Sequence, residues 1–171
     1  FEAFDKNTRP LKDLVKESIL NILEYSKDTK INLNNSLVLD LFAGTGSFGL
    51  ECISRGAEKV IFNENYKGVI EILEKKIKDL NFEKKSQILK SNCFNLAENF
   101  NQKVDIIFMD PPFKEKKINQ LILLILNMKI LKKKGLIIIH RNKNNEENLF
   151  EKLNILDVRY YGLSKIIFAN F

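Results

Sequence analysis

The chain has 171 residues, 44% of them hydrophobic, and its 28 Lys and Arg against 22 Asp and Glu give a net charge of +6. This composition is typical of one globular domain, and no apolar run is long enough to span a membrane. The start carries no secretory signal, and two distant cysteines with a single histidine exclude a disulfide framework and a multi-histidine metal site. We therefore expect a cytoplasmic protein with no metal.

From the N-terminus, apolar spacing predicts a helix over 10–25, a strand over 36–41, a helix over 47–55, a strand over 59–63 and a helix over 67–80. Next come a strand over 86–90, a short helix or turn over 92–99, a strand over 104–109, a helix over 115–128, a strand over 136–140 and a short helix over 146–153. The chain ends with a predicted β-hairpin of 155–160 and 163–171 about Gly162.

This alternation of strands and helices predicts a single α/β domain over residues 1–171. We expect three layers, with a mostly parallel seven-stranded sheet and a C-terminal antiparallel hairpin. Residues 1–30 are expected to form an N-terminal helical segment that is incomplete at its start, because Phe1 and not Met comes first.

The cysteines, the histidine and the excess lysines have simple interpretations. Cys52 and Cys93 are interpreted as small core or pocket-lining residues. His140 follows the apolar run 136–139, so we expect it at a surface strand end. Lysine clusters favour a polyanionic partner such as nucleic acid, although a lysine-rich composition without that role is the alternative. The clusters are Lys75-Lys76, Lys84-Lys85, Lys114-Lys116-Lys117 and Lys132-Lys133-Lys134.

Acidic residues lie at the ends of three predicted strands: Asp40, Glu64 and Asp110. Because the carboxyl ends of parallel strands meet at one edge of a sheet, where such folds bind ligands, these acids predict a site. The alternatives are that Asp40 is a helix or loop cap and Glu64 an exposed strand-end acid. Asp110 is alternatively a cap for the next helix.

A glycine loop, within LVLDLFAGTGSFGL at 37–50, accompanies the first of these acids. Gly44, Gly46 and Gly49 fit G-x-G-x-x-G, and Glu64 follows twenty residues after Gly44, as in a dinucleotide-binding fold. Asp40, however, would repel a phosphate and suits a ligand with an ammonium and a sulfonium charge. A nucleotide-binding α/β domain without methyl transfer stays open as an alternative.

The acid-x-x-x-Gly-x-Gly pattern resembles the first motif of class I S-adenosylmethionine-dependent methyltransferases, which implies their Rossmann-like fold. In that family the glycines let the backbone approach the methionyl group and ribose, Glu64 would accept ribose hydroxyls, and Asn92, where Asp is usual, would flank the adenine. The cofactor residues implied by the resemblance are Asp40, Phe42, Ala43, Gly44, Thr45, Gly46, Glu64, Asn65, Asn92, Cys93 and Asp110.

Residues 110–113, DPPF, match the motif with which amino-methyltransferases end their fourth strand. The resemblance implies that the Asp110 carboxylate and the Pro111 carbonyl accept the hydrogens of an exocyclic amino group, so that its lone pair faces the methyl group. Phe113 would stack on the base, unless it is a core aromatic. The implied catalytic residues are Asp110, Pro111, Pro112 and Phe113. No cysteine nucleophile is implied.

Four stretches in order, RPLKDLVKESILNIL, LDLFAGTGSFGLECISRGA, VDIIFMDPPF and YYGLSKIIF, are similar to the RsmD family, although Leu11 stands where Thr is usual. The resemblance implies methylation of a guanine N2 in bacterial small-subunit (16S) rRNA, with S-adenosylmethionine converted to S-adenosylhomocysteine. Candidate RNA contacts are Arg9, Lys114, Lys116 and Lys117. The implied partner is that rRNA or an assembling 30S particle, without a membrane, and we expect a monomer.

The main alternative is an N6-adenine methyltransferase acting on DNA or RNA. Enzymes that act on DNA usually carry a long target-recognition segment, for which this chain has no room.

Overall fold

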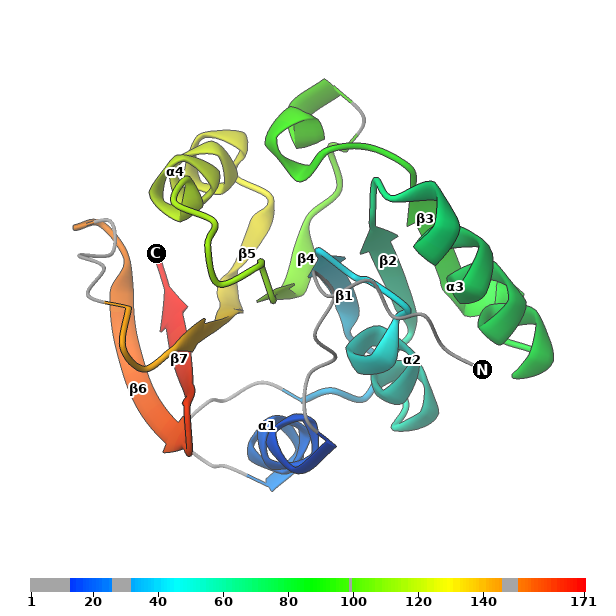
Figure 1. Cartoon of the computed structure of the whole chain (residues 1–171), viewed down its shortest axis with the longest axis horizontal. Helices are drawn as coiled ribbons and strands as arrows, with labels where there is room; N and C mark the ends of the chain where they lie inside the picture. The colour runs from blue at the N-terminus through cyan, green and yellow to red at the C-terminus, as the bar shows by residue number, and fades with distance from the viewer. Residues whose placement is uncertain (1–12, 26–31, 99, 146–150) are drawn as a thin grey trace.

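A computed structural model describes residues 13–25, 32–98, 100–145 and 151–171. Over these residues seven strands form one sheet in the order β3-β2-β1-β4-β5-β7-β6 (Figure 1). The strands are β1 (Leu37–Leu41), β2 (Lys59–Asn63), β3 (Ser86–Leu89), β4 (Val104–Met109), β5 (Leu131–Asn142), β6 (Asn154–Tyr161) and β7 (Ser164–Asn170). The helices are α1 (Asp13–Tyr25), α2 (Ser47–Ser54), α3 (Lys67–Asp79) and α4 (Ile118–Met128), with short 3-10 helices η1 (Glu83–Lys85) and η2 (Cys93–Glu98).

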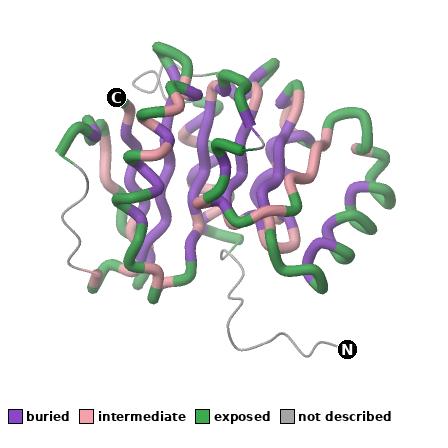
Figure 2. Tube along the Cα trace, turned by 90° about the horizontal axis from the view of Figure 1, so that it is seen from above, coloured by how far each residue is buried: buried purple, intermediate pink, exposed green. Residues whose placement is uncertain are grey.

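The sheet is the middle of three layers. Helices α1, α2 and α3 pack on one face, and α4 with η2 packs on the other. Side chains that alternate along a strand serve the two faces, so that Val38 faces α1 to α3 and Leu39 faces α4. Buried positions run along the strands, and the outer faces of the helices are exposed (Figure 2). The sequence prediction of a three-layer α/β fold is confirmed.

Strand direction determines which residues meet at each edge of the sheet. Strand β1 is parallel to β2 and β4, and β5 is parallel to β4. Strand β7 lies between β5 and β6 and is antiparallel to both. The carboxyl ends of β1, β2, β4 and β5 therefore share one edge, where the glycine loop and the DPPF loop both leave the sheet.

Most predicted elements agree with the structure to within one or two residues, and β2 and β4 have the predicted bounds. Helix α4 begins at Ile118 instead of residue 115, because Glu115 closes a turn in which its Oε1 accepts the Lys117 N–H at 2.7 Å. Strand β5 is longer than predicted because its exposed lysines at 132–134 interrupt the apolar pattern without interrupting the strand.

Two predictions concern segments that are only partly described. The predicted helix over 146–153 falls largely on 146–150, outside the described residues; its end is wrong, because Glu151 and Lys152 lie in a turn and Leu153 is not helical. The predicted start of the first helix, at 10–12, also lies outside the described residues, as does most of the segment 1–30. None of the helices in the described ranges is long and apolar enough to cross a membrane.

The expectation that His140 lies at a surface strand end is wrong. The residue is only 5% exposed, because β7 pairs with β5 beyond the apolar run, with His140 opposite Ile166. Because β7 pairs with β5, strand β5 lies inside the sheet and is not its edge strand.

Candidate functional site

The glycine loop joins β1 to α2 by a tight turn. Gly46 has φ +78°, a left-handed conformation that favours glycine, and its N–H donates to the Ala43 carbonyl at 2.8 Å. A Cβ at Gly46 would overlap the Leu73 side chain of α3 and come within 3.3 Å of Leu50. The loop therefore depends on a residue without a side chain.

Asp40 lies beneath this loop and is 1% exposed. Its Oδ2 accepts the N–H of Gly49, in the first turn of α2, at 3.1 Å. Burial raises the Asp40 pKa well above its ordinary value, the Gly49 bond lowers it, and the negative charges of Asp110 and Glu64 raise it further. Asp40 thus does cap a helix, as one alternative held, and its burial under the glycine loop disfavours the ionised form of its carboxyl group.

Glu64 joins two loops at the edge of the sheet. Its Oε2 accepts the Gly44 N–H at 2.8 Å, and its Oε1 accepts the N–H groups of Asn65 and Tyr66, each at 2.9 Å. An ionised carboxylate has about four acceptor positions, so about one is left for a ligand hydroxyl. Glu64 is therefore more than an exposed strand-end acid.

The segment after β3 forms the third side of the site. Asn92 Oδ1 accepts the Phe94 N–H at 3.0 Å, which starts the turn into η2. The rings of Phe42 and Phe94 meet edge to face, with centroids 6.5 Å apart. Cys93 is 5% exposed, and burial raises the pKa of its thiol to about 12. Such a thiol stays protonated at neutral pH and is a poor nucleophile.

The DPPF loop leaves β4 at the same edge. Asp110 Oδ1 lies 2.7 Å from His140 Nδ1, and the Asp110 side chain keeps 20% exposure. Among the described residues neither Asp110 Oδ2 nor the Pro111 carbonyl has a hydrogen-bond partner. The two acceptors that the sequence prediction named for an amino group are thus both available. One oxygen of the Asp110 carboxylate is bonded to His140, and the other oxygen is open to a ligand. Asp110 does not cap α4, so that alternative is wrong.

Strand β5 and its following turn support this loop through residues that sequence analysis did not select. Arg141, 1% exposed, donates to the Pro112 carbonyl at 3.2 Å and to the Glu115 carbonyl at 2.8 Å. Asn145 Nδ2 donates to the Phe113 carbonyl at 3.1 Å. A usable signal existed, because polar residues at the end of an apolar strand are the same feature that selected Asp40.

The candidate RNA contacts are only partly placed. Lys114, Lys116 and Lys117 are exposed on the loop after Phe113, and Lys117 Nζ lies 6.0 Å from the centroid of the Phe94 ring. Arg9 lies outside the described residues. Three lysines therefore lie beside the strand-end acids, where a polyanion could reach both.

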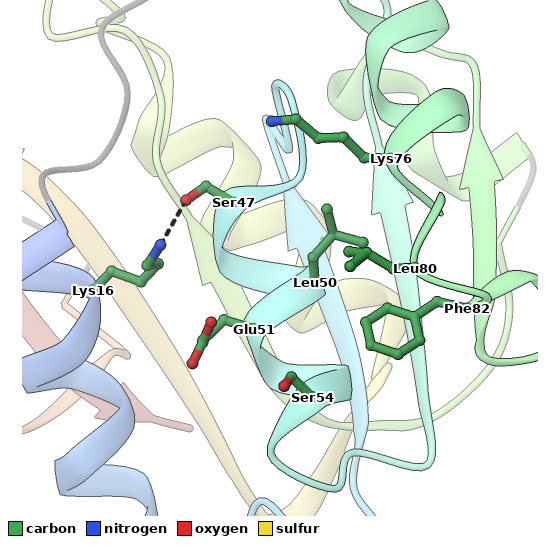
Figure 3. A pocket seen from close by; sticks show the side chains of 8 residues that line it. All are labelled: Lys16, Ser47, Leu50, Glu51, Ser54, Lys76, Leu80 and Phe82. Carbon is green, nitrogen blue, oxygen red and sulfur yellow. Dashed lines mark hydrogen bonds between the residues drawn. The ribbon is translucent and has the colours of Figure 1, made fainter. Parts of the chain in front are cut away.

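A separate pocket of about 240 Å³ lies on the outer side of α2, between α1 and α3 (Figure 3). Lys16 Nζ donates to Ser47 Oγ at 3.1 Å across it, and none of the strand-end acids lines it. It is lined by Lys16, Ser47, Leu50, Glu51, Ser54, Lys76, Leu80 and Phe82. No cluster of three metal-binding side chains occurs in the ranges that the structure describes.

This sheet order, the glycine loop after β1 and the acids that end β1, β2 and β4 together define a class I S-adenosylmethionine-dependent methyltransferase. Within that class, the chain belongs to the family described as Conserved hypothetical protein 95, the RsmD family, whose model matches residues 2–170.

Named relatives agree with this assignment. Ribosomal RNA small subunit methyltransferase D of Haemophilus influenzae is 36% identical over 91% of this chain and 79% of its own length. The protein of that name from Buchnera aphidicola of Baizongia pistaciae is 32% identical, over 86% and 70%. The solved structure of a Haemophilus influenzae protein described as a candidate methylase has a TM-score of 0.75 and 29% identity, covering 92% of this chain and 96% of that one.

Proposed function

We propose that this chain transfers the methyl group of S-adenosylmethionine to the N2 amino group of a guanine in small-subunit ribosomal RNA. The observation that carries the proposal is the meeting of Asp40, Glu64 and Asp110 at one sheet edge, beside the DPPF loop. The relatives named as small-subunit rRNA methyltransferases support the choice of substrate.

The residues present fit a cationic, ribose-bearing cofactor. Three carboxyl groups lie at the strand ends beside the glycine loop, and a Cβ at Gly44 would meet only the Phe42 carbonyl oxygen, at 4.0 Å, so that the backbone there borders open space that a side chain would occupy. S-adenosylmethionine, when bound, supplies a methyl group on a positively charged sulfur. In the proposed site Glu64 accepts from ribose hydroxyls and Asn92 from the adenine amino group. The proposed cofactor set is Asp40, Phe42, Ala43, Gly44, Thr45, Gly46, Glu64, Asn65, Asn92, Cys93 and Asp110.

The DPPF loop would orient the amino group that receives the methyl group. Its lone pair is delocalised into the base, so the chain must bind both hydrogens to localise that lone pair on the nitrogen and direct it toward the methyl group. Asp110 Oδ2 and the Pro111 carbonyl are the two acceptors, and the carboxylate also offsets the positive charge that grows on nitrogen. Phe113 would stack on the base, and Pro112 fixes the direction of the loop.

RNA binding would place an unstacked guanine in this loop. Lys114, Lys116 and Lys117 are proposed to contact phosphates near the target, together with Arg9. We propose rRNA, naked or in an assembling 30S particle, as the partner and a monomer as the active form.

The test uses labelled S-adenosylmethionine with small subunits that lack native methylation, and with naked rRNA and DNA in parallel. Mass spectrometry of digested nucleosides should show N2-methylguanosine from rRNA and no product from DNA. N6-methyladenine in either nucleic acid would instead support the adenine-specific alternative. Fully modified subunits are the control, because they should accept no further methyl group.

A second measurement separates the nucleotide-binding alternative. Calorimetry should detect binding of S-adenosylhomocysteine and none of NAD. Tight NAD binding without S-adenosylhomocysteine binding would contradict the proposed cofactor.

A further inference from the structure

We propose that His140 is a positioning residue for methyl transfer, which holds the Asp110 carboxylate through a chain of hydrogen bonds that begins at Ser164. The inference rests on the proposed function, because it assumes that Asp110 accepts from the amino group of the substrate. It adds a residue that lies thirty positions further along the chain and on a different strand.

The chain of contacts joins three elements at the site edge. Asp110 follows β4, His140 lies near the carboxyl end of β5, and Ser164 begins β7. His140 Nδ1 is 2.7 Å from Asp110 Oδ1, and His140 Nε2 is 2.9 Å from Ser164 Oγ. The ring is 5% exposed and Ser164 is 7% exposed. Both ring nitrogens are thus engaged in a place that water hardly reaches.

These two contacts select one form of the neutral imidazole ring. A carboxylate oxygen can only accept, so Nδ1 carries the proton that it donates to Asp110. Nε2 is then the acceptor, and the Ser164 hydroxyl donates to it. The Ser164 hydroxyl therefore selects the Nδ1–H tautomer of His140. The Nδ1–H group in turn holds the Asp110 carboxylate in one orientation.

The bond leaves the other carboxylate oxygen for the substrate. Oδ1 is directed at the buried ring, while Oδ2 has no partner among the described residues and the side chain keeps 20% exposure. Rotation of the carboxylate would break the bond to His140. The same ring packs edge to face on Phe113, with centroids 5.5 Å apart at an interplanar angle of 79°. One imidazole thus aligns both the acceptor and the ring proposed to stack on the base.

Nuclear magnetic resonance of the ¹⁵N-labelled protein tests the geometry without any substrate. His140 is the single histidine of the chain, so its ring signals need no assignment. At about pH 8, above the range in which an ordinary imidazole titrates, the ring should be the Nδ1–H tautomer with a slowly exchanging proton. Asp110→Ala should release that proton to rapid exchange. An Nε2–H tautomer in the wild-type protein would overturn the proposal.

Kinetics of two His140 variants test the role. His140→Leu keeps an apolar contact for Phe113 but removes the donor, and should lower kcat by about 10- to 100-fold, the cost of a misplaced reacting group. The affinity for S-adenosylhomocysteine and the KM for RNA should change less than about twofold, because neither depends on the direction in which Asp110 Oδ2 points. His140→Asn, whose amide can donate to Asp110, should restore most of kcat.

The outcomes separate this inference from the proposed function. A wild-type kcat in folded His140→Leu, or equal losses in the Leu and Asn variants together with lost cofactor binding, would overturn the positioning role. If the wild-type protein methylates no guanine, the proposed function fails, whereas the tautomer still reports whether His140 holds Asp110. Ser164→Ala is the intermediate case, in which a smaller loss of kcat is expected because the donor to Asp110 remains.

Discussion

Three carboxyl groups at one sheet edge have three different environments. Asp40 is buried and accepts one amide, Glu64 is held by three backbone amides, and Asp110 shares one oxygen with an imidazole. Glu64, with three of about four acceptor positions taken, mainly holds two loops together, whereas Asp110, with one oxygen bonded to His140, presents its other oxygen to a ligand. At the scale of residues, the hydrogen-bond partners therefore separate the roles of acids that look alike in sequence.

Asp110→Ala tests the role of the carboxylate that is proposed to accept from the substrate. Loss of the carboxylate should reduce turnover by at least about 100-fold, because an acceptor aimed at developing charge is worth that much in other enzymes. Cofactor affinity should be largely spared, since Asp40 and Glu64 remain. Single-turnover methylation and calorimetry with S-adenosylhomocysteine measure the two effects. Retained turnover would remove Asp110 from the mechanism.

Asp40→Asn tests the electrostatic consequence of burial. Because the pKa of Asp40 is raised in the folded protein, the folded state binds more protons than the unfolded state above about pH 4, the ordinary range of an aspartate. The free energy of unfolding therefore falls as the pH rises from there through the folded pKa. Asparagine keeps an acceptor for Gly49 but carries no charge, so the variant should lose this dependence.

The measurement is urea unfolding of both proteins at several pH values from acid to neutral. Relative to the wild type, the Asp40→Asn variant should become more stable as the pH rises. A stability difference that does not change with pH would show that Asp40 is not desolvated in solution as it is in the structure.

At the scale of elements, the approach of α2 to β2 sets the position of the glycine loop. Gly49 faces the sheet so closely that a Cβ would overlap the Phe62 ring and lie 2.8 Å from Val60 Cγ1. Its N–H is also the one bonded to Asp40. The helix therefore cannot move away from the sheet without disturbing the acid beneath the loop.

Gly49→Ala should lower the free energy of unfolding by about 1–3 kcal/mol, the usual cost of overpacking a core. Gly68→Ala is the matched control, because Gly68 is also a helix glycine but its Cβ would meet only Tyr66, at 3.8 Å. This control should be neutral or stabilising by up to about 1 kcal/mol. Thermal or urea unfolding compares them, and equal effects would mean that α2 does not pack as closely as described.

At the scale of the whole molecule, lysine clusters lie at both ends of the sheet. Lys114, Lys116 and Lys117 follow the DPPF loop at the carboxyl ends of the strands. Lys132, Lys133 and Lys134 begin β5, which is parallel to β4, so they lie at the opposite end. Lys132 also pairs with Asp105 at 2.8 Å. Only the first cluster is beside the proposed site, although both contribute to the net charge of +6.

Replacement of Lys114, Lys116 and Lys117 by alanine should weaken RNA binding and reduce its salt dependence. Each lost phosphate contact changes the slope of log affinity against log salt by roughly 0.7–0.9, so three contacts account for about 2.1–2.7. The control replaces Lys132, Lys133 and Lys134 and should change the slope less. Filter binding over a range of salt concentrations measures both, and equal slopes for the two variants would refute a localised RNA surface.

Features that depend on residues close together in the chain were predicted more accurately than features that depend on distant residues. Strand and helix positions were predicted closely because the periods of 2 and 3.6 residues are properties of the local backbone. Asp40, Glu64 and Asp110 were predicted together because parallel strands align their ends. The error at His140 involves a partner that local patterns do not reveal, Ser164, which lies 24 residues further along the chain. The error at the start of α4 is a local one, because the Glu115 carboxylate accepts the Lys117 N–H in a turn that apolar spacing does not show.

By itself, the sequence determined the order of elements, the glycine loop and the acids at the ends of three strands, since each depends on residues that are close together in the chain. Only the tertiary structure decided that β7 lies between β5 and β6, and therefore that His140 is buried between Asp110 and Ser164. It also decided that Arg141 is bonded to the carbonyls of the loop it supports. The physical reason is that burial and hydrogen bonding between distant segments arise only when strands pair, and strand pairing depends on the packing of the whole sheet.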